Sequence, residues 1–118
     1  MNFSTAGPAS IVLSRMRILE AKLEESDLSL AVKASRLDAL SAAEFKKECN
    51  ELWRNGIHTV SVDLSQVQFI DSSGVGALLS LFKRLPPANP TVRLNCVQPA
   101  VRAVIELLRL HQIFEVET

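Results

Sequence analysis

Apolar and polar residues alternate in three short stretches of the chain, and each stretch predicts a β-strand. The first covers residues 28–34, the second residues 60–64 and the third residues 92–96. A period of two residues puts the apolar side chains of a strand on one face. These strands are therefore predicted to lie half-buried, with that face against a core.

A helical period follows the first of these strands, in residues 41–56. Ser41 and Glu44 match the S-x-x-E pattern of a capping box, which predicts that the helix begins there. Asn55 and Gly56 predict its end, because both residue types are common just after a helix. The predicted apolar face consists of Ala42, Phe45, Cys49, Leu52 and Trp53.

Two more helices are predicted after the second and third strands. Pro86 and Pro87 end the first of them, because proline removes a backbone donor and clashes with the preceding turn. The other covers residues 98–110, with Pro99 in its first turn, where a missing N–H costs nothing. The apolar face predicted for the helix before the prolines is Val75, Leu78, Leu79, Phe82 and Leu85.

The pattern of residues 17–26 fits two structures. Its apolar residues alternate as in a strand, yet they also fit a helical stripe, and the composition favours a helix. A Glu-Ser-Asp turn follows, which would suit a hairpin with residues 28–34. Residues 114–118 could form a short last strand. Strands that alternate with helices predict one α/β domain whose sheet is mostly parallel, with right-handed crossovers.

Composition narrows the choice of partner and compartment. The chain has 118 residues, enough for one domain with its own core, and 13 basic residues balance 13 acidic ones. Zero net charge gives no electrostatic reason to expect nucleic acid or an anionic membrane as partner. Neither a signal peptide nor a membrane-spanning stretch occurs in the pattern, so a cytoplasmic protein is expected. Cys49 and Cys96 fall on predicted apolar faces and are expected to be reduced core thiols.

The stretch Ile-Asp-Ser-Ser-Gly-Val-Gly, residues 70–76, joins a strand to a helix, where sites form in open α/β sheets. Ser72 or Ser73 can cap the helix by accepting from a free backbone N–H. Gly74 and Gly76 reduce steric bulk in the first turn, so another surface could approach closely, at a cost of roughly 1 kcal/mol of helix propensity each.

The residues alone allow other interpretations of this junction. The serines could simply cap the helix, or the helix N-terminus could bind an anion. The stretch has neither a Walker pattern nor a dinucleotide fingerprint. A catalytic serine is disfavoured, because G-x-S-x-G is absent and neither His58 nor His111 lies near the serines in the sequence. No metal-ligand spacing, cofactor motif or catalytic residue is predicted.

Residues 62–85 closely resemble the central motif of STAS domains, the sulphate-transporter and anti-sigma-factor-antagonist family. In the bacterial anti-sigma factor antagonists of that family a hydrophobic pair precedes D-S-[ST]-G-[LV]-G, here Phe-Ile-Asp-Ser-Ser-Gly-Val-Gly. Residues 35–46 are similar to the family's G-x-L-D-x-x-[ST]-A-x-x-F segment, and residues 97–116 to its last helix and strand. The chain departs from the family at Ser35 and Arg109, where glycine is common.

The resemblance implies a STAS domain at residues 16–118, after a flexible extension at residues 1–15. Its fold would be a mixed, mostly parallel sheet of four to five strands with three to four helices, and residues 18–25 would become its first strand. Ser72 would be the phosphoacceptor, because the phosphorylated serine of the family directly follows the aspartate. The partner-binding residues would be Asp38, Asp71, Ser72, Ser73, Gly74 and Gly76.

The function implied is a phosphorylation-controlled partner switch. The unphosphorylated protein would bind a GHKL-type anti-sigma factor serine kinase, which would phosphorylate it, and a PP2C-type phosphatase would reverse this. The chain would then be a substrate and ligand, with no enzymatic activity, no binding to nucleic acid and no insertion into a membrane. The alternative is a STAS accessory subunit of a membrane transport complex for lipids or anions, and a third class is a module that binds a small ligand or nucleotide.

Overall fold

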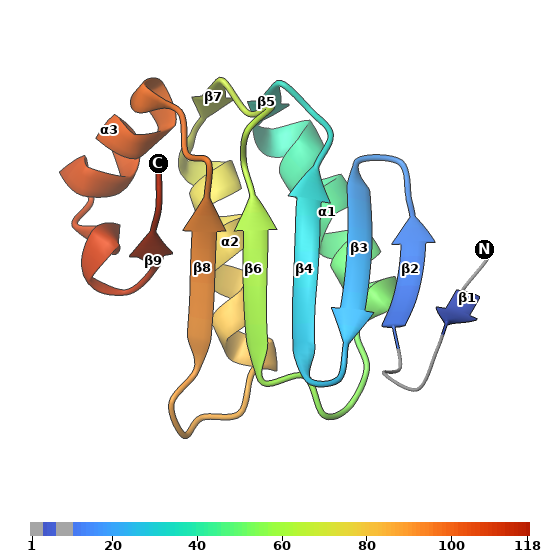
Figure 1. The fold of residues 1–118 in the computed structure, drawn as a ribbon. Helices are drawn as coiled ribbons and strands as arrows, with labels where there is room; N and C mark the ends of the chain where they lie inside the picture. The colour runs from blue at the N-terminus through green and yellow to red at the C-terminus, as the bar shows by residue number, and fades with distance from the viewer. Residues whose placement is uncertain (1–3, 7–10) are drawn as a thin grey trace.

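The computed structural model describes residues 4–6 and 11–118. Its elements are β1 (Ser4–Ala6), β2 (Ile11–Arg15), β3 (Leu19–Glu24), β4 (Asp27–Val32), β5 (Arg36–Leu37), α1 (Ala39–Leu52), β6 (Thr59–Asp63), β7 (Phe69–Ile70), α2 (Ser72–Arg84), β8 (Thr91–Asn95), α3 (Pro99–Leu107), the 3-10 turn η1 (Leu110–Gln112) and β9 (Glu115–Val116). Among the described residues, seven strands form one sheet in the order β1-β2-β3-β4-β6-β8-β9, and β5 pairs with β7 separately (Figure 1).

The predicted fold class, a single α/β domain with a mixed sheet, is confirmed. Strands β1 to β4 pair antiparallel, whereas β4, β6, β8 and β9 pair parallel through helical crossovers. The sheet has more strands than the four to five expected, because β1 and β2 extend one edge, whereas β9 at the other edge is the short last strand expected at residues 114–118. The pattern of residues 17–26, which fitted either structure, belongs to strand β3, and the expected hairpin with β4 is present.

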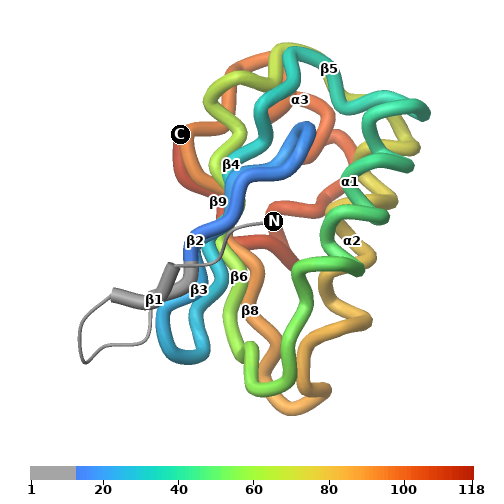
Figure 2. The backbone as a smooth tube through the Cα atoms, turned by 90° about the vertical axis from the view of Figure 1, so that its right-hand side faces the viewer, coloured from blue at the N-terminus to red at the C-terminus, as the bar shows by residue number. Residues whose placement is uncertain are grey.

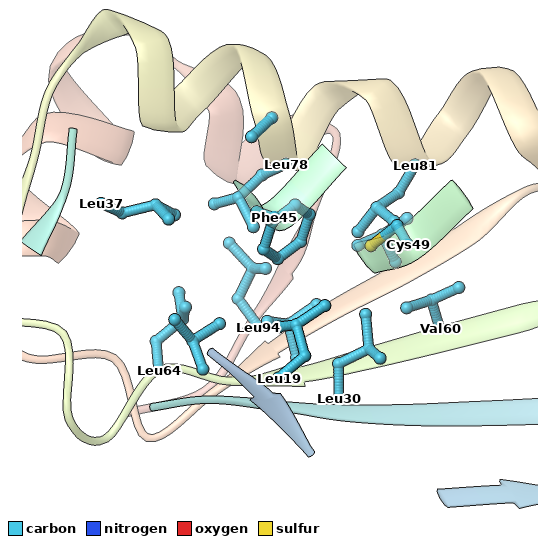
Figure 3. Packing of buried hydrophobic residues seen from close by; sticks show 14 of the residues in the cluster. Leu19, Leu30, Leu37, Phe45, Cys49, Val60, Leu64, Leu78, Leu81 and Leu94 are labelled. Carbon is cyan, nitrogen blue, oxygen red and sulfur yellow. The ribbon is translucent and has the colours of Figure 1, made fainter. Parts of the chain in front are cut away.

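Helices α1 and α2 cover one face of the sheet and leave the other face open (Figures 1 and 2). The core lies between these helices and the sheet. There, Phe45 and Leu78 from the helices pack against Leu19, Leu30 and Leu94 from the strands (Figure 3). All five side chains are almost completely buried, which for residues of this size stabilises the fold by roughly 1.5–3 kcal/mol each. This single core orients the first turns of α1 and α2 toward the carboxyl ends of the parallel strands.

Strand β2 lies inside the segment that the sequence assigns to an N-terminal extension. It pairs with β3 from Ile11 opposite Glu24 to Arg15 opposite Glu20. The sheet therefore begins before residue 16, where the domain was predicted to start. Part of the extension, residues 1–3 and 7–10, lies outside the described residues, and its flexibility stays a prediction.

Two local predictions are corrected by the structure. Helix α1 ends at Leu52 with Trp53 as its C-cap, before the predicted stop at residues 55–56. The buried face of α2 includes Ala77 and Leu81, whereas Leu79 and Phe82 are only half-buried. The predicted and the observed buried faces of α2 both have helical spacing. Packing of the helix against the sheet decides which of the two is buried.

The two cysteines differ in their surroundings. Cys49 is buried, and burial raises the pKa of its thiol to about 12, so it is an inert core thiol as predicted. Cys96 is exposed, contrary to the prediction, because β8 ends at Asn95 and the next residue turns out of the strand with φ of 55°.

A buried carboxylate on α1 was not predicted. Glu48 is 1% exposed, and its Oε1 accepts hydrogen bonds from the backbone N–H groups of Ile18 at 3.2 Å and Leu19 at 3.0 Å. Burial is the main cause that raises the pKa of Glu48 to about 7, and a side-chain hydrogen bond with Glu44 adds to it. Glu48 thus ties the start of β3 to α1.

Candidate functional site

The short ladder between β5 and β7 brings two distant turns together. Arg36 lies opposite Phe69, and Leu37 opposite Ile70, in parallel register. The backbone N–H of Asp71 donates to the carbonyl of Leu37 at 3.4 Å. Because a helix begins directly after each strand, Asp38 and Asp71 stand at the starts of α1 and α2, at the same end of the molecule (Figure 1).

Asp38 is the N-cap of α1. Its Oδ1 accepts from the backbone N–H of Ser41 at 3.3 Å, and the Ser41 hydroxyl accepts from the backbone N–H of Asp38 at 2.9 Å. This reciprocal pair replaces the predicted capping box of Ser41 with Glu44, since the helix begins three residues earlier than expected. The backbone N–H of Ser41 is the main cause that lowers the pKa of Asp38, with smaller contributions from the Ser41 hydroxyl and Arg36.

Asp71, and neither serine, caps α2. Its Oδ1 accepts from the backbone N–H groups of Ser73 at 2.9 Å and Gly74 at 3.1 Å. The prediction that Ser72 or Ser73 caps this helix is therefore wrong, because the helix already includes both serines. The carboxylate also occupies two of the N–H groups that a bound anion would use at this helix N-terminus.

Ser72 is exposed at the start of α2. It is the first residue of α2, it is exposed, and within the described part of the chain no hydrogen bond engages its hydroxyl. Ser73, the next residue, is half-buried. Ser72 is therefore more accessible to another molecule than Ser73.

The two glycines of the motif have different surroundings. A Cβ on Gly74 would overlap the carbonyl oxygen of Leu37 and lie 2.7 Å from Cγ1 of Ile70. Gly74 is therefore required for the first turn of α2 to pack on the β5–β7 ladder. A Cβ on Gly76 would meet nothing within 4 Å. Of the two, only Gly76 leaves room that another molecule could use.

Three further residues of this end of the molecule were missed by the sequence analysis. The Arg36 guanidinium lies 4.1 Å from the centre of the Phe69 ring, and its Nε lies 3.4 Å from Oδ2 of Asp38. Phe69 is 40% exposed, and Leu40, in the first turn of α1, is 86% exposed. The adjacent pair Phe69-Ile70 carried a signal, because neighbours in a strand face opposite sides and one of the two had to face outward.

This end of the molecule thus combines two capping carboxylates, one open hydroxyl, one stacked guanidinium and two exposed apolar side chains. We call the set of Arg36, Asp38, Leu40, Phe69, Asp71 and Ser72 the two-turn surface. In the described ranges, 4–6 and 11–118, no group of three or more His, Cys, Asp or Glu residues could hold a metal ion. Over the same ranges, no helix is both long and apolar enough to cross a membrane.

Known proteins share this fold. An anti-sigma factor antagonist from Mycobacterium paratuberculosis superposes with a TM-score of 0.70 at 20% identity, covering 95% of this chain and 89% of that one. The anti-sigma factor antagonist SpoIIAA in its unphosphorylated form gives 0.66 at 19% identity, covering 92% and 89%. Its phosphorylated form, described as a Bacillus cell fate determinant, gives 0.60 at 17%, covering 92% of each chain.

A part of a larger protein is also similar. The murine anion transporter Slc26a9, in its inward-facing state, gives a TM-score of 0.57 at 19% identity, covering 70% of this chain but 14% of the transporter. At such identities these likenesses establish the fold. The sequence itself matches the family model of the STAS domain over residues 20–118, which is most of the chain. The chain therefore belongs to the STAS domain family.

Proposed function

We propose that this chain is a phosphorylation-controlled anti-sigma factor antagonist. The observation that carries the proposal is Ser72, an exposed and unengaged hydroxyl at the first position of α2, directly after the capping carboxylate Asp71. The partner would be a GHKL-type anti-sigma factor serine kinase in the cytoplasm. The kinase would transfer the γ-phosphoryl group of ATP to Ser72 Oγ, with loss of the hydroxyl proton and release of ADP.

The exposed apolar residues support a protein partner. Leu40 is exposed in the first turn of α1 and Phe69 is exposed in β7, just before Asp71, and aromatic side chains commonly anchor protein interfaces. The partner-binding residues proposed from the motif, Asp38, Asp71, Ser72, Ser73, Gly74 and Gly76, lie in the same two turns. Gly74 is buried, so its contribution would be to hold the shape of the surface, whereas Gly76 would allow close approach.

Charge provides the switch. A phosphate on Ser72 adds −1.5 to −2 charges next to two carboxylates. A partner that binds the unmodified surface would then have to desolvate this group or leave. A loss of about 3 kcal/mol would weaken binding roughly 150-fold, since 1.4 kcal/mol is a factor of ten. A PP2C-type phosphatase would hydrolyse the phosphate ester and restore binding, so the chain itself needs no catalytic group.

Phosphate mapping tests the proposal. The protein would be incubated with ATP and each GHKL-type serine kinase of the same genome, and the site located by fragment mass spectrometry. Phosphate is expected on Ser72, it should persist in Ser73→Ala, and it should be absent from Ser72→Ala. Phosphate mainly on Ser73, or no phosphorylation by any such kinase, contradicts the proposal.

The likeness to Slc26a9 favours one second candidate, a STAS subunit that docks on a membrane transporter. In that case partner binding would not respond to phosphorylation at Ser72. A gene for an ATP-binding cassette or an anion carrier beside this one would support the transport role, whereas neighbouring kinase and phosphatase genes would support the switch.

A further inference from the structure

A phosphate on Ser72 would meet an end of the molecule that is already negative. Asp71 accepts the backbone N–H groups of Ser73 and Gly74, at 2.9 and 3.1 Å, so these donors are not free for a second anion. Asp38 contributes a further carboxylate at the neighbouring turn. The helix N-terminus alone therefore does not neutralise the phosphate, and a cation has to come from a side chain.

Arg36 is a cation in direct contact with this surface. Its Nε lies 3.4 Å from Oδ2 of Asp38, and its guanidinium stacks over the Phe69 ring at 4.1 Å. The Arg36 side chain is 59% exposed, so it can move without disturbing the core. A guanidinium carries five N–H donors, and the contact with Asp38 uses the one on Nε. The terminal nitrogens can still form the paired hydrogen bonds that phosphate favours.

The strand register places Arg36 within reach of Ser72. Arg36 lies opposite Phe69 in the β5–β7 ladder, and Ser72 is the third residue after Phe69. Past this pair, the backbone N–H of Asp71 donates to the carbonyl of Leu37 at 3.4 Å, so the separation of Arg36 from Ser72 spans this bonded pair, with Ser72 displaced in the direction in which both strands run. The arginine side chain already points along this direction, because it binds Asp38, two residues further along its own segment. An arginine and a phosphoserine can bridge this separation with their side chains.

We infer that Arg36 is the counter-ion of a phosphate on Ser72, and that it exchanges its single hydrogen bond to Asp38 for a paired contact with the phosphate. The inference rests on the proposed function, which makes Ser72 the modified residue. Guanidinium–phosphate pairs are often bidentate and are stronger than a single hydrogen bond to an exposed carboxylate. Phosphorylation would then act twice on the two-turn surface. It adds negative charge, and it draws Arg36 away from Phe69 and Asp38, which a partner would otherwise meet in their unmodified arrangement.

The second pKa of the phosphate reports this contact directly. The full chain would be produced with phosphoserine incorporated at position 72 during translation, so that no kinase is needed, and its phosphorus NMR resonance titrated between pH 4 and pH 8. A guanidinium beside the phosphate favours the dianion and lowers this pKa. Arg36→Gln is expected to raise it by about 0.7 unit, which follows for unit charges about 4 Å apart in a water-like dielectric.

Arg93→Gln is the matched control, because Arg93 is an exposed arginine paired with a carboxylate, Glu115, at 2.9 Å on the edge of the sheet. It should leave the phosphate pKa unchanged. In the unmutated protein, the Nε–H resonance of Arg36 should also shift as the phosphate titrates. The inference would be overturned by equal phosphate pKa values in the unmutated and Arg36→Gln proteins. It would also be overturned if the chemical shift of the Arg36 Nε–H did not change as the phosphate titrates. Failure of every kinase to modify Ser72 would instead refute the proposed function and leave this measurement intact.

Discussion

Replacing Gly74 by alanine tests the close packing between α2 and the β5–β7 ladder. The added methyl group would overlap the Leu37 carbonyl oxygen and lie 2.7 Å from Cγ1 of Ile70. Leu37 O is a backbone atom of a paired strand, so it cannot turn aside as the end of a flexible side chain would. The first turn of α2 has to move instead, and with it Ser72.

The expected size of the effect follows from two opposing contributions. Overpacking of a filled site typically costs 1–3 kcal/mol, and more where backbone has to move, whereas alanine in a helix gains about 1 kcal/mol over glycine. Gly74→Ala should therefore destabilise the fold by about 2 kcal/mol. The methyl group added in Gly76→Ala would have no atom within 4 Å, so only the gain in helix propensity remains. This variant should therefore be more stable than the unmutated protein by up to about 1 kcal/mol.

Urea denaturation followed by circular dichroism measures both free energies of unfolding. The two variants make the same chemical change two residues apart in one helix, so the difference between them isolates the contact with Leu37. The reasoning is refuted if Gly74→Ala is as stable as the unmutated protein, or if the two variants change stability equally.

Three more predictions concern carboxylates. Asp71→Ala should lower the free energy of unfolding by about 1 kcal/mol, because the N–H groups of Ser73 and Gly74 lose their cap. Ser72→Ala should change it by less than about 0.5 kcal/mol. Equal effects of the two variants in urea denaturation would contradict the assignment of the cap. Asp38→Asn keeps an oxygen for the N–H of Ser41, so the thermal midpoint should barely change while kinase binding or Ser72 phosphorylation falls; the reverse pattern would restrict Asp38 to capping. The raised pKa of Glu48, about 7 against an ordinary value of 4.5, means that the folded state holds this proton more tightly than the unfolded chain. Stability should therefore fall as pH rises from about 4.5 to above 7, by on the order of 3 kcal/mol, and Glu48→Gln should remove this part of the pH dependence; an unchanged profile in Glu48→Gln would refute it.

The periodicity of apolar residues predicted those strands and helices that are long enough to show a period. The alternation in residues 28–34, 60–64 and 92–96 corresponds to β4, β6 and β8, and the three helical stretches to α1, α2 and α3. Strands β5 and β7 have two residues each, too few for any period to show, and they exist because the core brings their backbones together. The resemblance to a family, and not periodicity, placed residues 17–26 in a strand.

The residues of the two-turn surface were predicted in part. The motif pointed to Ser72 and both aspartates. The residue types alone left open whether a serine or Asp71 caps α2, because Asp and Ser cap helices equally well and only the position of the first turn decides between them. Arg36, Leu40 and Phe69 have no local signal of function. Their importance comes from the β5–β7 pairing, which places Arg36 across from Phe69.

The β5–β7 ladder also determines what kind of molecule could imitate this protein. It joins residues 35–38 to residues 68–71 by backbone hydrogen bonds, including those from Gln68 and Phe69 to the carbonyl of Ser35. A partner that contacts both turns therefore recognises a discontinuous epitope. A linear peptide that copies the serine motif alone would lack Arg36, Asp38 and Leu40, and would have no scaffold to hold Ser72 at a helix start. An effective competitor would have to reproduce two segments and the ladder between them, which favours folded miniproteins or stapled two-segment mimics over short peptides.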